Sequence, residues 1–335
     1  MRLAVSIGCP SGVGPEVSVV AAARAPEGTR VLLVGDQKVI ARAASARGVS
    51  LTRIAVWQPT ETLAARDRKL GRPSQAGGAA QLAWIDAACD LTSSGKADAL
   101  VTGPVSKDAI ASSGSRVARQ FLGHTEHLQR RLHAREAVMT FASEKLTTSL
   151  VTTHLPLRDV PDAITKAAVA RATFWLADFL IRNKRRHRGP LRIAVAALNP
   201  HAGEQGRIGH EEGRIVQGIA RARQRLSGAR LRAALFGPIP AETAFRLAAQ
   251  GEYDGVVAMY HDQATIPMKL LGFGDAVNVT LGLPIIRTSV DHGTAYDRAA
   301  KFDADPSGMT AAIKLAASMA RFARARSRSR RGPPQ

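Results

Sequence analysis

Cysteine and aromatic residues are scarce in this chain of 335 residues. The two cysteines, Cys9 and Cys89, lie far apart with no metal-binding spacing between them, which fits a reducing compartment. Aromatic residues make up 4% of the chain, so the core must be built mainly from Ala, Leu, Val and Ile. Apolar residues still account for 45%, which is ample for a sizeable core in two lobes.

Long apolar runs and one familiar nucleotide motif are also missing. No apolar run approaches the roughly 20 residues of a membrane span. The stretch Leu3 to Ile7 is too short for the core of a signal peptide. We therefore expect a cytoplasmic protein without a membrane attachment. No Gly-x-Gly-x-x-Gly motif follows the first expected strand, so a Rossmann dinucleotide site is not supported.

Acidic residues are outnumbered 27 to 47 by Lys and Arg, which gives a net charge of +20. The positive charge is concentrated at Arg182 to Arg192, interpreted as a solvated turn, and at Arg321 to Arg331. Residues 325–335 are expected to form a disordered basic tail. Such charge would suit a nucleic-acid surface. However, neither block is interleaved with aromatic residues for base stacking. A basic enzyme of anionic substrates is therefore favoured over a nucleic-acid partner.

Strand and helix patterns alternate along the chain. This alternation predicts α/β layers with mostly parallel sheets. Asp36 is the expected N-cap of an early helix. The predicted strands cover 2–8, 30–35, 97–102, 137–142, 147–153, 191–198 and 255–259. The predicted helices cover 15–24, 37–47, 76–91, 162–183, 211–226, 241–250 and 307–324.

Three histidines, His154, His201 and His261, each follow the end of a separate apolar strand. Ends of parallel strands can converge at one edge of a sheet. Neutral imidazoles bind Zn²⁺ and similar divalent ions, with positions left open for substrate oxygens. The pattern therefore indicates a metal-assisted α/β enzyme that acts on an anionic small molecule.

A fourth histidine, His124, and the neighbouring Thr125 open a short helix after Gly123, so that both side chains could face a cleft. His127, one turn further on, is interpreted as a helix-surface residue.

Five segments together carry a family resemblance. They are GHTEHL (123–128), TTHLPLRDV (152–160), LNPHAGEQG (198–206), AMYHDQ (258–263) and VNVTLGLPIIRTSVDHGTA (277–295). In this order they resemble the 4-hydroxythreonine-4-phosphate dehydrogenase family of vitamin B6 biosynthesis, from about Ser6 to Tyr296.

The resemblance implies a two-lobed α/β/α subunit of the isocitrate/isopropylmalate dehydrogenase type. We expect one lobe at 1–130 with 288–324 and the other at 131–287. It also implies a homodimer with its active site in the interlobe cleft near the interface. Part of the metal site would then come from the partner subunit.

The resemblance further implies metal-dependent oxidation of 4-phosphooxy-L-threonine at its 3-hydroxyl by NAD or NADP, followed by decarboxylation to 3-amino-2-oxopropyl phosphate. One divalent ion (Zn²⁺, Mg²⁺ or Co²⁺) would be held in each site. The metal ligands would be His154, His201 and His261. The contacts to this small phosphorylated hydroxy-amino acid would be His124, Thr125, Lys269, Asn278 and Arg287.

Two roles stay open. Asp262 and Asp291 are candidates for the proton acceptor, but either could instead orient a histidine. The segment from Asp291 to Lys301 resembles the adenosine-side loop of isopropylmalate dehydrogenases, which would make His292, Gly293 and Thr294 cofactor neighbours. A plain joint at a helix N-terminus explains that segment equally well.

Departures from the family pattern keep other substrates open. Cys9 stands where the family usually has Asp, and Ala264-Thr265 replaces the usual Gly-Leu. Relatives with the same chemistry oxidise phosphorylated aldonates such as 4-phosphothreonate or 4-phosphoerythronate, or aromatic dihydrodiols. An acyltransferase of the phosphotransacetylase type is the alternative from another class, and it should not need the three histidines.

Overall fold

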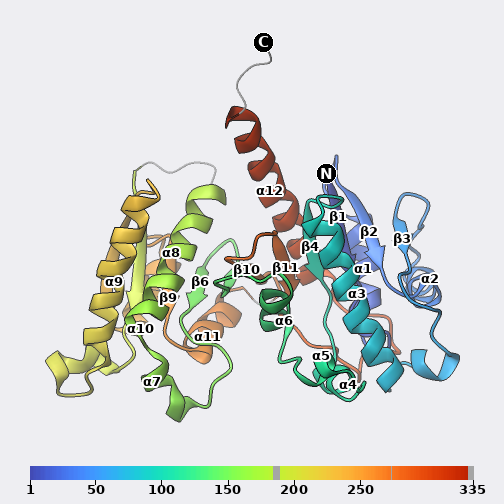
Figure 1. Cartoon of the computed structure of the whole chain (residues 1–335), viewed down its shortest axis with the longest axis horizontal. Helices are drawn as coiled ribbons and strands as arrows, with labels where there is room; N and C mark the ends of the chain where they lie inside the picture. Colours follow the sequence, from blue (N-terminus) through green and yellow to red (C-terminus); the bar gives the residue numbers. More distant parts are fainter. Residues whose placement is uncertain (184–188, 273, 331–335) are drawn as a thin grey trace. The chain divides into compact units, whose positions relative to one another are not determined.

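The computed structural model describes residues 1–183, 189–272 and 274–330. The chain folds into two compact units (Figure 1). The first unit consists of Met1–Arg135 and Leu283–Gln335, and the second of Glu136–Gly282. The borders were expected at 130/131 and 287/288. They differ because the strand Arg287–Val290 pairs with a strand of the first unit, so that Arg287 belongs to that unit.

The first unit contains a parallel sheet with the strand order β3-β2-β1-β4-β11. All four residues of β4 are buried, as are Leu3 to Ser6 of β1. Strands of this kind belong to sheets that are covered on both faces. The strands are β1 (Arg2–Ser6), β2 (Arg30–Val34), β3 (Ala55–Trp57), β4 (Ala99–Thr102) and β11 (Arg287–Val290).

Helices follow most of these strands. Asp36 accepts a hydrogen bond from the backbone N–H of Val39 (2.9 Å), so it caps α2 as the sequence predicted. The helices of this unit are α1 (Gly14–Ala23), α2 (Gln37–Ala46), α3 (Gln75–Ser93), α4 (Lys107–Ala111), α5 (Arg116–Arg119), α6 (His124–Arg131) and α12 (Ser307–Arg330), with the 3-10 helix η1 (Ala65–Arg68).

The second unit contains a mixed sheet with the strand order β10-β5-β6-β9-β7-β8. Strands β10, β5 and β6 are antiparallel neighbours, whereas β6, β9, β7 and β8 run parallel. The strands are β5 (Val138–Ala142), β6 (Thr147–Leu150), β7 (Leu191–Ala196), β8 (Ala233–Ile239), β9 (Gly255–Ala258) and β10 (Val277–Leu281).

The helices of the second unit flank this sheet (Figure 1). Its core joins aliphatic and aromatic side chains such as Phe141, Leu150, Phe245 and Met268. The helices are α7 (Val160–Ala163), α8 (Lys166–Asn183), α9 (Glu211–Gly228), α10 (Ala241–Ala249) and α11 (His261–Leu271), with the 3-10 helices η2 (Leu157–Asp159) and η3 (Pro200–Gly206).

The predicted α/β fold is confirmed, and the expected extent of the basic tail needs correction. The basic tail was expected to be disordered from residue 325, but α12 continues to Arg330 because the arginines and serines there extend the helix. Residues 331–335 of that tail, and 184–188 of the basic turn, lie outside the described residues. Within the described ranges, no helix is long and apolar enough to cross a membrane.

Candidate functional site

His154 and His261 lie side by side in the second unit, with ring centroids 5.6 Å apart. His154 follows β6 and is exposed, while His261 is the first residue of α11 and is partly exposed. The two strands that precede them are parallel neighbours, with Leu150 paired to Ala258. Their carboxyl ends therefore meet at one sheet edge, as the sequence predicted.

Hydrogen bonds fix the strand ends that carry these histidines. Thr152 Oγ1 donates to the carbonyl of Met259 (2.7 Å) and so links the segment after β6 to the end of β9. Gln263 accepts from Met259 N–H (2.7 Å) and donates to the carbonyl of Ala197 (2.9 Å), which links β9 to β7. The geometry of the three strand ends thus depends on polar groups whose role the sequence did not indicate.

His201 follows β7 but sits on an unusual backbone. Residues 201–205 all have positive φ, between 46° and 76°, so η3 contains a left-handed turn. Such a conformation costs a non-glycine residue roughly 1–2 kcal/mol. Glu212 of α9 helps to hold the turn, because its carboxylate accepts from the backbone N–H groups of Leu198 (3.1 Å) and Asn199 (2.8 Å). Strain of this kind is often found at functional sites.

The three histidines are not gathered into one ligand set within the chain. Across the described ranges, no three His, Cys, Asp or Glu side chains are close enough to hold a metal ion. The side-by-side imidazoles of His154 and His261 fit two positions of a tetrahedral or octahedral divalent ion. Asp262, whose Oδ1 lies 2.8 Å from His261 Nδ1, suits the orientation of that ring.

The other two expected site residues of the second unit lie on different elements. Lys269 is exposed in the last turn of α11. Asn278 lies on β10, is partly exposed and is paired with Phe141 of β5. Lys269 can therefore bind an anion from solvent. The side-chain amide of Asn278 on β10 can form hydrogen bonds with a ligand.

Arg287 is the buried cation of the first unit, with 2% of its surface exposed. Its Nη2 donates to Thr102 Oγ1 (2.8 Å), and Thr102 Oγ1 donates in turn to Ser289 Oγ (3.0 Å). Burial lowers the pKa of Arg287 to about 9, although the negative charge of Glu126 opposes this shift. Burying an arginine is costly unless it is paired, and the electrostatic interaction with Glu126 offsets part of that cost.

His124 opens α6 close to this arginine. Its Nε2 atom is buried and has no hydrogen-bond partner among the described residues. Burial holds the pKa of His124 well below its usual value, and the positive charges of Arg287, His127 and Lys107 add to this effect. His124 is therefore a neutral imidazole at neutral pH, able to hydrogen-bond a substrate. Thr125 beside it is also buried.

Lys107 is the first residue of α4 and is exposed. A Cβ atom added at Gly123, the N-cap of α6, would lie 3.9 Å from Lys107 Nζ and 2.9 Å from Glu126 Oε2. Gly123 thus keeps space between this cation and this anion at the start of α6. Nothing in the local sequence could indicate this, because Lys107 belongs to α4.

The proposed cofactor segment packs against the first loop of the chain. Val13 N–H donates to the carbonyl of Thr294 (3.0 Å), and a Cβ atom added at Gly12 would lie 2.6 Å from that carbonyl oxygen. Cys9 Sγ lies 3.5 Å from Tyr296 Oη, and burial raises the pKa of both side chains. The sequence did not predict that these two loops would meet.

The remaining residues of that segment are more open. His292 and Gly293 are exposed, and Asp291 is partly exposed. His292 Nδ1 lies 3.0 Å from the carbonyl of Gly293. Exposed backbone and a ring at the end of β11 would be accessible to a ligand.

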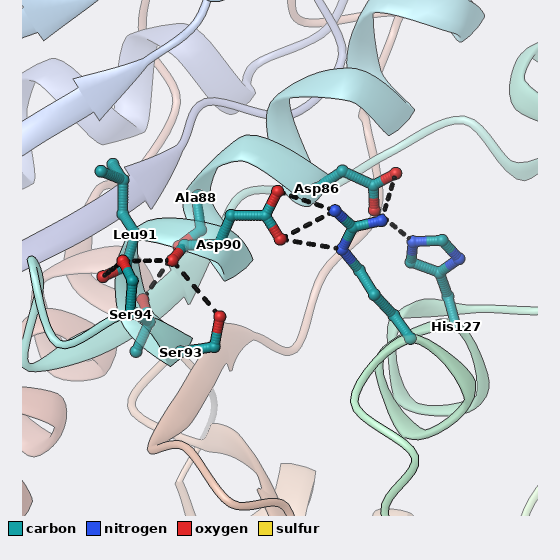
Figure 2. Close-up of polar contacts among 9 residues, drawn as sticks. Asp86, Ala88, Asp90, Leu91, Ser93, Ser94 and His127 are labelled. Atoms are coloured by element: carbon teal, nitrogen blue, oxygen red, sulfur yellow. Dashed lines mark hydrogen bonds and ion pairs between the residues drawn. The ribbon is translucent and has the colours of Figure 1, made fainter.

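One interpretation of α6 was wrong. His127 was taken for a surface residue, but it is 3% exposed and its Nε2 lies 2.6 Å from Asp86 of α3 (Figure 2). The local periodicity could not reveal this partner, because Asp86 is remote in sequence.

Comparisons with known proteins agree with this architecture. A relative from Geobacter metallireducens, a 4-hydroxythreonine-4-phosphate dehydrogenase, is 42% identical, and the match covers 96% of each chain. The crystal structure of 4-hydroxythreonine-4-phosphate dehydrogenase from Klebsiella pneumoniae matches with a TM-score of 0.78 and 34% identity, over 95% of this chain and 99% of that one. A terephthalate 1,2-cis-dihydrodiol dehydrogenase from Burkholderia xenovorans matches with a TM-score of 0.66 and 28% identity, over 95% and 98%.

These relatives are all named dehydrogenases, which confirms the predicted oxidoreductase class. A family model described as pyridoxal phosphate biosynthetic protein PdxA matches residues 27–316. The chain belongs to this family.

Proposed function

We propose that the chain oxidises 4-phosphooxy-L-threonine at its 3-hydroxyl with NAD or NADP and a divalent metal ion, and that the product then loses CO₂ to give 3-amino-2-oxopropyl phosphate. The observation that carries this proposal is the 42% identity, along 96% of both chains, to a relative named for that substrate. The paired imidazoles of the second unit and the buried arginine of the first supply groups suited to this chemistry.

The reaction balances as follows. A hydride leaves carbon 3 for the nicotinamide, and the hydroxyl proton passes to a base, which leaves a ketone β to the carboxylate. The carbon–carbon bond to the carboxylate then breaks, and the remaining enolate carbon takes up a proton. We assign the proton acceptor to Asp291, which is partly exposed just after β11. Asp262 Oδ1 lies 2.8 Å from His261 Nδ1 and suits an orienting role.

His154 and His261 would supply two imidazole ligands of the metal ion. When bound there, a divalent ion supplies Lewis-acid chemistry that makes the substrate hydroxyl more acidic. The third imidazole, His201, would complete the set in a homodimer, because one chain does not bring it to the pair.

Four exposed apolar side chains support a second copy of the chain as the partner. Leu155 and Leu157 follow His154, and Ile266 and Leu270 belong to the helix that His261 opens. Clusters of exposed apolar residues are typical of protein–protein interfaces. Because they are close in sequence to His154 and His261, a dimer interface formed by them would lie near these two metal-ligand candidates.

Each unit carries side chains suited to bind the anionic substrate groups. Arg287 can offer a bidentate fork to phosphate or carboxylate, whereas Lys269 acts as a point charge. The neutral imidazole of His124, the hydroxyl of Thr125 and the amide of Asn278 would form hydrogen bonds with the hydroxyl or amino group of the substrate. His292, Gly293 and Thr294 would contact the dinucleotide through the loop that packs on the first loop of the chain.

Turnover assays on matched substrates test the proposal. We expect reduced cofactor to form from 4-phosphooxy-L-threonine, and a chelator to abolish its formation until a divalent ion is restored. A strong preference for 4-phosphothreonate or 4-phosphoerythronate would replace the substrate and keep the chemistry. Chelator-insensitive acyl transfer from acetyl phosphate would instead contradict the dehydrogenase proposal.

A further inference from the structure

Two pairs of side chains join α6 to α3 in the first unit (Figure 2). On α6, His127 and Arg131 are one turn apart; on α3, Asp86 and Asp90 are one turn apart. His127 Nε2 lies 2.6 Å from Asp86 Oδ1, and Arg131 Nη1 lies 3.2 Å from Asp86 Oδ2. Arg131 Nη2 also lies 2.7 and 2.8 Å from the two oxygens of Asp90. Each helix thus contacts the other through both members of its pair.

The helix that these pairs hold is short. An eight-residue helix is marginal without tertiary contacts. Its N-cap, Gly123, has no side chain that could cap the first turn. The link from His127 to Asp86 lies one turn from the end of α6 that carries His124 and Thr125, so it ties this part of the helix to α3.

A shared aromatic contact couples His127 to His124. The ring of Phe121 lies 5.4 Å from the ring of His127 and 6.0 Å, edge to face, from the ring of His124. A rotation of His127 away from Asp86 would therefore change the packing of the ring on which His124 rests. Packed interiors transmit such shifts because they contain little free volume.

We propose that His127 is a positioning residue: its hydrogen bond to Asp86 sets the first turn of α6, and hence His124 and Thr125, for binding of the anionic substrate. Asp86 is an acceptor, so His127 carries its proton on Nε2. This inference rests on the proposed function in so far as His124 and Thr125 contact the substrate. The alternative is that the bond between His127 and Asp86 only stabilises the fold and does not affect substrate binding by His124 and Thr125.

Three variants separate the two cases. H127A removes the link, H127Q places an amide N–H near the position of Nε2, and H133Q changes an exposed histidine just beyond the end of α6 as the control. The measurements are KM and kcat for 4-phosphooxy-L-threonine, the affinity for inorganic phosphate by calorimetry, and the urea midpoint of unfolding.

We expect H127A to raise KM and to weaken phosphate binding by about tenfold, as is typical when the residue that orients a binding group is lost. H127Q should restore both values to within about twofold of the wild type by the same reasoning. H133Q should match the wild type in every measurement.

The outcomes are decisive in either direction. If H127A lowers the urea midpoint but leaves KM and phosphate affinity unchanged, the link is merely structural and the proposal is overturned. If the wild type binds phosphate but does not oxidise the substrate, the proposed function fails, and the phosphate affinities of H127A and H127Q still decide the positioning role. If the wild type does neither, both proposals fail.

Discussion

The imidazole rings of His154 and His261 lie 5.6 Å apart although they follow different strands, β6 and β9. This pair is the part of the expected metal site that a single chain assembles. The third histidine, His201, follows the next strand of the same sheet but is carried on a left-handed turn. Whether the expected metal site is completed therefore depends on which subunit supplies His201.

Complementation between two inactive variants tests whether His201 acts across a dimer. H154A and H201A should each lack activity. If His201 reaches the histidine pair of another subunit, a mixed dimer of the two variants has one intact site. After unfolding and refolding together, the mixture should regain on the order of a quarter of the wild-type activity, since half of the dimers are mixed and half of their sites are intact.

The control for that experiment is a mixture of H154A and H261A. These two changes affect the same pair, so no combination of subunits restores a complete site and the mixture should stay inactive. Recovery in the control, or no recovery in the mixture of H154A and H201A, would contradict the shared-site arrangement.

The hydroxyl of Thr102 should contribute to stability through its bonds to Arg287 and Ser289. Thr102→Val keeps the shape of the side chain but leaves these buried polar groups without that partner. We expect a loss of about 1–3 kcal/mol in the free energy of unfolding, measured by urea titration. Thr52→Val, at an exposed threonine, should change it little. Equal effects from the two variants would count against the network.

Neutral His124 should make the fold sensitive to acid. Burial lowers its pKa in the folded protein, whereas in the unfolded chain it titrates near about 6.5. Below that pH the unfolded state binds more protons than the folded state, so the free energy of unfolding falls as the pH decreases. Above that pH, the contribution of neutral His124 to stability is complete. The urea midpoint of His124→Asn should fall less than that of the wild type between about pH 6.5 and 5. Parallel curves would show that His124 does not titrate differently in the two states.

The contact between Gly12 and Thr294 should matter for the cofactor. Gly12→Ala places a Cβ atom 2.6 Å from the carbonyl oxygen of Thr294 and must displace that loop. We expect the KM for the dinucleotide to rise about tenfold or more, since a small misplacement of a binding group is costly. Gly213→Ala, where an added Cβ meets no atom within 4 Å, is the matched control. An unchanged cofactor KM in Gly12→Ala would remove His292 to Thr294 from the cofactor site.

The sequence predicted those features that depend on local pattern. Alternation of apolar runs predicted the α/β fold, and Asp36 was correctly expected to cap α2. The strand ends that bear His154 and His261 were also correct, because parallel neighbours end at the same edge.

Features that depend on long-range contacts were not predictable. The bond from His127 to Asp86 and the packing of Thr294 on Gly12 join segments that are far apart in sequence, and neither periodicity nor spacing reports such pairs. The left-handed turn at His201 was also missed, since residues 201, 202, 204 and 205 are not glycine and would ordinarily avoid positive φ. The strands β10 and β11 were not among the predicted strands, because each mixes apolar and polar side chains.

The most direct test of the central proposal is the ratio of two products from one substrate. Purified protein would be supplied with 4-phosphooxy-L-threonine, NAD or NADP and a divalent ion, and reduced cofactor and released CO₂ would be measured together. We expect equal amounts of both, and neither after chelation of the metal. Reduced cofactor without CO₂, or no turnover of this substrate beside rapid turnover of a phosphorylated aldonate, would contradict the account.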